Sequence, residues 1–199
     1  MGFERFGRIA RRKVAGRSAG LLAVSFGALV ALSAPSMAQS IATPVGASVT
    51  LPGGASSLTE THEDWTVSCQ VQNNEKRCLF SQTLGNQQTG QRVLSIELRP
   101  QDNGEVQGVI LAPFGLRLSD GVTLKVDDKA IGDPVPFSTC MEAGCLVPVT
   151  LDSSTLGTVS GGEKMTVNAL NSANGQPVEL TLSLKGFTAA MNRAKELMQ

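Results

Sequence analysis

The sequence contains a single histidine, His62, in a chain of 199 residues. This scarcity removes the side chain that most often acts as a general base, and it makes a metal site with several histidines impossible. A Ser-His-Asp or Cys-His catalytic site would have to be built around His62. Catalysis by carboxylates alone stays open, because acidic residues are present in several places.

Sequence motifs that hold cofactors are also missing. The chain has no P-loop, no dinucleotide-binding fingerprint and no calcium-binding loop. Its acidic clusters are Glu63-Asp64, Asp127-Asp128 and Asp102 with Glu105. Each lies in or beside a predicted turn, where carboxylates commonly accept hydrogen bonds from nearby backbone N–H groups. We therefore predict no catalytic residue, no metal site and no cofactor.

The first 38 residues have the features of a secretory signal peptide. Basic residues precede an apolar run, Ala19–Leu32, that is too short to span a bilayer as a stable helix. The small residues Ser36 and Ala38 then match a signal peptidase site, so we predict cleavage after Ala38. The alternative is an uncleaved amphipathic or membrane helix. No cysteine follows the run to carry a lipid anchor, and the residues around Arg11-Arg12 favour general secretion over a twin-arginine route.

Removal of this signal changes the charge of the chain. The signal contains six of the 17 basic side chains but only one of the 17 acidic ones, which leaves 11 bases and 16 acids in the mature chain. The resulting net charge of −5 provides no basic surface for nucleic acid or anionic lipid. We expect no nucleic-acid partner and no transmembrane segment in the mature chain, which would be periplasmic, outer-membrane-associated or secreted.

Residues 39–61 consist mostly of Ala, Ser, Thr, Gly and Pro. Such a segment has too few large apolar side chains to offset the entropy that ordering would cost. We predict a flexible spacer over 39–61, which either holds the domain away from a membrane or wall or is merely a tolerated terminus. Residues 62–199 are predicted to form one β domain around one core.

From Trp65 onward, apolar and polar residues alternate with a period of two. The alternation recurs in short segments between turn residues, which is typical of antiparallel strands with one buried face. The clearest segments are 65–70, 94–99, 122–126, 165–169 and 178–184. Only the segment from Phe187 to Leu197 has the pattern of an amphipathic helix. The predicted fold class is all-β, a single antiparallel β-sandwich or partly open barrel with a short C-terminal helix.

All four cysteines follow the predicted signal, and an even number in an exported chain indicates structural disulfides. A two-residue turn at Asn73-Asn74 would place Cys69 opposite Cys78 in a hairpin. Counting outward from that turn makes them a non-hydrogen-bonded pair, whose close spacing suits a disulfide. The spacing therefore predicts a bond between Cys69 and Cys78.

The second pair, Cys140 and Cys145, would close a short loop in which Gly144 is available for a left-handed conformation. The alternative is a bond from Cys69 to Cys140 or Cys145, which would link distant parts of the domain. Metal binding and redox chemistry are the rival roles. A redox role would favour a two-residue spacer between the cysteines, so a structural role is preferred.

Several short motifs occur in a characteristic order. They are Trp65, Val67 and Cys69, the second cysteine Cys78, the run 112–128, Pro136-Phe137 before Cys140, Gly144-Cys145, and the segment 183–191 with Gly186 and Phe187. Together they resemble the invasion-associated locus B family of alphaproteobacterial envelope and secreted proteins. The resemblance implies a signal peptide, a location in the periplasm or cell envelope and, for the named members, virulence through entry into or colonisation of host cells. It implies no known reaction.

Two hypotheses about function follow from these observations. The first is an exported, non-catalytic binding protein that recognises an unknown protein or envelope polymer through the loops of a rigid sandwich. The second is a hydrolase that acts on an envelope or host polymer through two carboxylates about 5 to 10 Å apart in a pocket. The sequence favours the first, because it offers no recognisable catalytic cluster.

The predicted signal can be tested directly. We expect amino-terminal sequencing of the exported protein to begin at Gln39, because Ser36 and Ala38 fit the narrow pockets of signal peptidase. A first residue before Ala34, or retention of the apolar run, would contradict the assignment.

Overall fold

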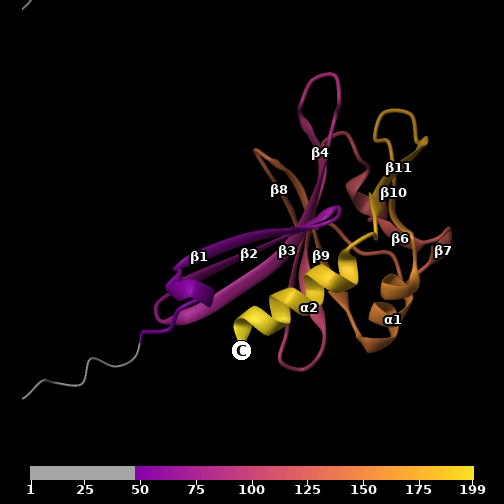
Figure 1. Ribbon diagram of the computed structural model, residues 1–199. Coiled ribbons are helices and arrows are strands. Elements are labelled where there is room, and N and C mark those ends of the chain that lie inside the picture. The colour runs from indigo at the N-terminus through magenta and orange to yellow at the C-terminus, as the bar shows by residue number, and fades with distance from the viewer. Residues whose placement is uncertain (1–47) are drawn as a thin grey trace, which may run out of the picture. The chain divides into compact units, whose positions relative to one another are not determined.

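The computed structural model describes residues 48–199, whose strands form two antiparallel sheets (Figure 1). The larger sheet has seven strands, in the order β1 (Ser57–His62), β2 (Trp65–Gln72), β3 (Glu75–Gly85), β4 (Arg92–Pro100), β5 (Val106–Ala112), β9 (Gly144–Leu151) and β8 (Thr139–Met141). The smaller sheet has four, in the order β11 (Pro177–Ser183), β10 (Lys164–Leu170), β6 (Thr123–Val126) and β7 (Lys129–Ala130). The predicted antiparallel β class is confirmed, and both sheets are open rather than closed into a barrel.

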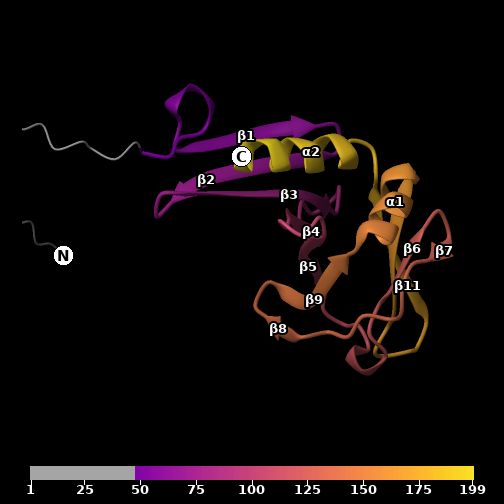
Figure 2. The same cartoon turned by 90° about the horizontal axis from the view of Figure 1, so that it is seen from below.

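Two α-helices accompany the sheets, α1 (Ser153–Gly161) and α2 (Phe187–Met198). The predicted C-terminal helix is confirmed as α2, which packs mainly against β3 and β2 and also contacts β4 and β1 (Figure 2). Its buried side chains recur at helical spacing and face the large sheet: Phe187, Ala190, Met191, Ala194 and Leu197. The helix therefore covers the apolar face of the first strands.

The alternation expected from Trp65 onward is present in β2. Trp65, Val67 and Cys69 are buried, while the residues between them are partly exposed. In β3 the inward positions continue with Cys78, Phe80 and then a polar residue, Gln82.

The first disulfide has the predicted pairing and the predicted turn. Cys69 lies opposite Cys78, with the two sulfur atoms 2.03 Å apart and the Cα atoms 4.1 Å apart. Asn73 and Asn74 have φ values of 51° and 61°, which is the left-handed conformation that a type I′ turn requires at both central positions. The hairpin geometry thus follows from the local sequence.

The second disulfide joins Cys140 to Cys145, as predicted, but the segment is a hairpin between β8 and β9 and not merely a loop. Gly144 pairs with Met141 and has a φ of 140°, outside the left-handed helical region that we expected. A Cβ atom at this position would collide with the carbonyl oxygen of Ala112 on β5. Gly144 is therefore required for the close approach of two backbones.

The predicted spacer over 39–61 is wrong at its C-terminal end. Residues 57–62 form β1, which pairs with β2 over its whole length, and Leu51 is buried in the core. The residues of β1 alternate between exposed and partly buried. Because β1 is an edge strand, Leu58 and the aliphatic parts of polar side chains are enough to pack it against the core. The signal 1–38 and the rest of the spacer, 39–47, lie outside the described residues.

The helix α1 was not expected, because its sequence contains glycine, serine and threonine instead of strong helix formers. Its first turn is held by Asp152, whose carboxylate accepts a hydrogen bond from the Thr155 backbone N–H at 2.7 Å. This bond lowers the pKa of the Asp152 carboxyl below its ordinary value. Leu156 and Val159, three positions apart, bury one side of the helix.

A buried amide side chain joins the two sheets. Gln82 on β3 is 6% exposed, and its Oε1 accepts the backbone N–H of Ser183 on β11 at 2.9 Å. Its Nε2 donates to the carbonyl oxygens of Ser183, at 3.0 Å, and Asp64, at 3.1 Å. The indole Nε1 of Trp65 donates to the same Ser183 carbonyl at 3.0 Å. The last residue of β11 is thereby bonded to both β2 and β3.

Three aromatic rings pack beside this junction. Trp65, Phe80 and Phe187 are each fully buried, and their ring centroids lie 5.2 to 5.5 Å apart in tilted or edge-to-face arrangements. They come from β2, β3 and α2, respectively. The aromatic contacts therefore hold the helix to the sheet at the same end at which Gln82 reaches β11.

An ion pair holds the other side of α2 to the edge of the large sheet. Arg193 donates from Nε and Nη2 to the two carboxylate oxygens of Glu60 on β1, at 2.7 and 2.8 Å. These bonds lower the pKa of the Glu60 carboxyl, while burial acts in the opposite direction. His62 contributes a weaker contact, with its Nε2 3.5 Å from Glu60 Oε2.

We expect Gln82→Ala to lower the free energy of unfolding by about 2 to 4 kcal/mol, because it removes three hydrogen bonds and leaves backbone groups of Ser183 and Asp64 with fewer partners. Gln70→Ala, at an exposed position of β2, is the matched control and should change stability by less than about 0.5 kcal/mol. Urea unfolding measures both. Equal stabilities of the two variants would show that the sheets are held together without Gln82.

The Glu60–Arg193 pair predicts a loss of stability in acid. Because folding lowers the pKa of Glu60, its contribution is complete above the ordinary carboxyl pKa and disappears as the pH falls through the lowered value. Urea midpoints measured across this acidic range should fall less steeply for Glu60→Gln than for the wild type. Glu97→Gln, at an exposed position of β4, should follow the wild-type curve. Parallel curves for Glu60→Gln and the wild type would contradict this account.

Candidate functional site

The acidic clusters singled out from the sequence lie in turns, as predicted. Glu63 adopts a φ of 53° in the turn between β1 and β2, and Asp127 and Asp128 form the turn between β6 and β7. The Asp127 carboxylate accepts the backbone N–H groups of Glu163 and Lys164 at 3.1 Å each. It therefore fixes the start of β10 against the turn of the neighbouring strand.

The remaining predicted residues are placed at different ends of the fold. His62 ends β1 beside Glu60, and the two disulfides lie within separate hairpins. Within residues 48–199 no group of three or more His, Cys, Asp or Glu side chains is arranged to hold a metal ion. His62, the cysteines and the acidic clusters therefore do not form one common site.

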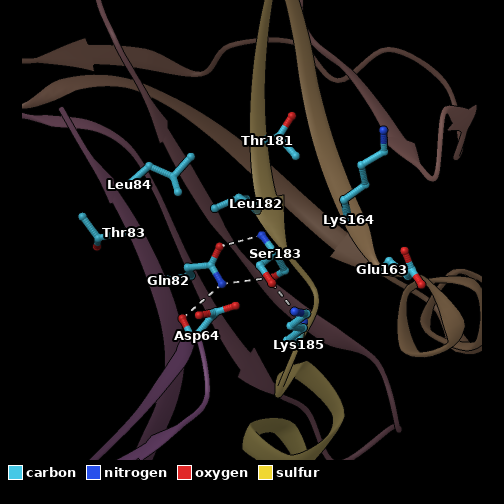
Figure 3. Close-up of a pocket in the computed structure, with 10 residues that line it drawn as sticks. All are labelled: Asp64, Gln82, Thr83, Leu84, Glu163, Lys164, Thr181, Leu182, Ser183 and Lys185. Atoms are coloured by element: carbon cyan, nitrogen blue, oxygen red, sulfur yellow. Dashed lines mark hydrogen bonds between the residues drawn. The ribbon is translucent and has the colours of Figure 1, made fainter. Parts of the chain in front are cut away.

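A groove of about 540 Å³ lies where the two sheets meet (Figure 3). One wall is the end of β3, with Gln82, Thr83 and Leu84, and the other is the end of β11, with Thr181 and Ser183 among its residues. The volume lies in the range that protein pockets use for small ligands or short peptide segments. This groove is the candidate functional site.

The floor of one end of the groove is rigid. Gln82 bonds to Ser183 across it, and the side chains of Leu84 and Leu182 lie above this bridge on opposite walls (Figure 3). Leu182 is fully buried, whereas Leu84 is only partly buried. Leu84 therefore gives the groove an accessible apolar surface beside the hydrogen-bonded amide groups.

Charged side chains of both signs surround the groove. Asp64 lies in the β1–β2 turn, Glu163 precedes β10, Lys164 begins β10, and Lys185 lies between β11 and α2. Lys164 is paired with Asp128 at 3.1 Å, and the backbone N–H of Lys185 donates to the Ser183 hydroxyl at 3.2 Å. A mixed rim of this kind suits recognition of a polar or polypeptide surface more than concentration of one ion type.

Most of the groove was missed from the sequence: Asp64 and Ser183 belong to segments noted for other reasons, but no motif contains Gln82, Thr83 or Leu84. One signal was present: Gln82 occupies an inward position of a strand whose other inward positions, Cys78 and Phe80, are apolar. A buried polar side chain needs a partner, so this position predicts a specific hydrogen-bonded contact. The partner, Ser183, is 101 residues away and could not be named from the pattern.

Folding lowers the pKa of two carboxyl groups that hold secondary-structure elements in place. Arg193 lowers the pKa of Glu60, and the backbone of Thr155 lowers that of Asp152. Both carboxyls are thus held in the ionised form for structural contacts, whereas a carboxyl that acts as a general acid needs a raised pKa. The chemistry that the groove displays is hydrogen bonding and apolar contact.

Comparison with known proteins finds matches to this chain in both sequence and fold. The family model described as invasion associated locus B (IalB) protein matches residues 65–195, which include both walls of the groove. A relative named as an invasion protein B homolog, from Brucella abortus strain 2308, is 48% identical over 147 residues, or 74% of this chain and 84% of the relative. Invasion protein B of Bartonella bacilliformis is 32% identical over 176 residues, or 86% and 94% of the two chains.

A solved structure agrees with these sequence matches. The crystal structure of invasion associated protein b from Bartonella henselae has a TM-score of 0.66 and 30% sequence identity to this chain. The match covers 70% of this chain and 96% of that one. Sequence and structure therefore lead to the same conclusion as the cysteine and tryptophan motifs: this chain belongs to the invasion associated locus B protein family.

Proposed function

We propose that this chain is an exported, non-catalytic interaction protein of the bacterial envelope, which binds a partner protein or envelope polymer through the groove between its sheets. The observation that carries the proposal is the groove itself, whose two walls are locked by the bonds of Gln82 to Ser183. A preformed site loses little conformational entropy when a ligand binds. Its lining offers apolar and hydrogen-bonding groups together, as binding sites commonly do.

Two features support export. Both disulfides are of the kind that forms and persists in oxidising compartments outside the cytoplasm. The first 38 residues have the composition of a secretory signal. Separately, neither helix within residues 48–199 is long and apolar enough to cross a membrane.

The names of the relatives connect the proposal to host cells. Proteins called invasion protein B occur in Bartonella, and a homolog so named occurs in Brucella abortus. We extend this association to the present chain, as a contribution to host-cell entry or colonisation. In this proposal the groove recognises its partner after export, and the disulfide-bonded hairpins keep the fold intact there.

The test is capture of a partner from envelope extracts by the mature protein. Leu84→Lys places a charge on the groove wall and should abolish capture, because a lysine desolvated beside Leu182 is unfavourable. Leu118→Lys is the matched control: Leu118 is 47% exposed and does not line the groove, so capture should persist. Thermal unfolding of both variants establishes that each is folded.

Two results would contradict the proposal. The first is capture that survives Leu84→Lys, which would exclude the groove as the binding site. The second is hydrolysis of an envelope or host polymer that is lost in Asp64→Asn or Glu163→Gln with folding intact, since these two acids line the groove. That outcome would establish the carboxylate hydrolase instead.

A further inference from the structure

The strand that forms one wall of the groove is the edge strand of its sheet. β11 pairs with β10 on one side only and ends the order of the four-stranded sheet. In an antiparallel strand, the N–H and C=O groups of alternate residues point to opposite sides. Ser183 points both of its groups away from β10, because they bond to Gln82 and Trp65, whereas the next residue, Leu184, donates to Glu163 at the start of β10.

This alternation determines which residues of β11 point their backbone N–H and C=O groups away from β10. Glu179 and Thr181 are separated from Ser183 by even numbers of residues, so their N–H and C=O groups also point away from β10. No strand of residues 48–199 pairs with them on that side. The edge of β11 therefore presents donors and acceptors at the spacing of an extended chain.

The side chain of Gln82 already occupies this edge in the manner of a peptide group. Its carboxamide accepts from the Ser183 N–H at 2.9 Å and donates to the Ser183 carbonyl at 3.0 Å (Figure 3). A backbone residue of an added antiparallel strand would exchange the same two bonds. At the floor of the groove, Gln82 thus makes the two hydrogen bonds that one residue of a paired strand would make to Ser183. Glu179 and Thr181 precede Ser183 along the same edge of β11.

The accessible stretch of edge has two limits. Gln82 occupies Ser183 at one end, and Pro177, which has no N–H group to donate, begins the strand at the other. Proteins commonly protect the edges of sheets with proline and with charged residues. Between Pro177 and the residue bonded to Gln82, the backbone groups of Glu179 and Thr181 have no strand partner on this edge within the described part of the chain. Of these two residues, Thr181 lines the groove.

The opposite wall selects the form of the occupant. β3 continues past Ser81, the last residue that pairs with β2, and places Thr83 and Leu84 across from Thr181 (Figure 3). A single extended segment is narrower than the edge of a folded sheet, so the presence of a second wall favours such a segment as the occupant. Such a segment would place an apolar side chain beside Leu84, whose side chain is partly exposed in the groove.

We propose that the groove binds an extended peptide segment of a partner protein, which adds as a strand to the open edge of β11 at Glu179 and Thr181. This inference rests on the proposed function and specifies the chemistry of its ligand. The backbone of the peptide provides the hydrogen bonds, and one apolar side chain beside Leu84 provides selectivity.

The test uses the mature chain and a phage-displayed library of short linear peptides as the probe. A synthetic peptide of the selected sequence should slow hydrogen–deuterium exchange at the amides of Glu179 and Thr181, since both would gain an acceptor. Thr181→Pro removes the N–H that faces the groove and leaves the bonds to β10 in place. It should weaken peptide binding by about tenfold or more.

Thr181→Val is the matched control, because it keeps the backbone N–H and changes only the side chain, whose hydroxyl lies 3.3 Å from that of Thr166. Its affinity should stay within about twofold of the wild type. If Thr181→Pro fails to fold, hydrogen–deuterium exchange at Glu179 and Thr181 of the wild-type protein, with and without peptide, still tests strand addition. Peptide binding without protection of the two amides, or binding unaffected by Thr181→Pro in a folded variant, would overturn strand addition.

Failure of this inference is distinguishable from failure of the proposed function. If no peptide is selected while Leu84→Lys still abolishes capture from envelope extracts, the peptide ligand is wrong and binding in the groove stands. If neither assay depends on the groove, both proposals fail. Concentration-dependent dimers that disappear in Thr181→Pro would overturn the peptide in favour of a second copy.

Discussion

The arrangement of the two sheets depends on the bonds that converge on Ser183. Its backbone N–H donates to the side-chain oxygen of Gln82, and its carbonyl oxygen accepts hydrogen bonds from the side-chain nitrogen of Gln82 and from the indole N–H of Trp65. These contacts satisfy buried polar groups that would otherwise lack partners, which is costly in a low-dielectric interior. They set where β11 ends relative to β2 and β3, and therefore also the width of the groove.

The aromatic cluster and α2 reinforce the same junction from the other side. Phe187 begins the helix only four residues after Ser183, so the chain has little freedom between the bonded end of β11 and the packed ring. Gly186, between them, has a φ of 83°, and a Cβ atom there would collide with the carbonyl oxygen of His62. The turn from strand to helix thus requires glycine, which accounts for its place in the motif that first suggested the family.

Local features of the fold could be predicted from the sequence, and distant ones could not. The hairpin of Cys69 and Cys78 follows from a turn and a count of residues, and α2 follows from its apolar face. The helix α1 was missed because its N-cap at Asp152 and two apolar residues outweigh poor helix propensity. The groove was missed for a different reason: it depends on one contact between residues 101 positions apart, and one sequence has no pattern that announces such a contact.

The order of the cysteines has a consequence for how the protein matures. The first cysteine is bonded to the second and the third to the fourth. The bonds join Cys69 to Cys78 and Cys140 to Cys145, across separations of only nine and five residues. Coupling of the thiols in the order in which they occur along the chain therefore produces the native set of bonds. No rearrangement by thiol–disulfide exchange is needed, and each hairpin can be oxidised before the residues that complete the core have folded onto it.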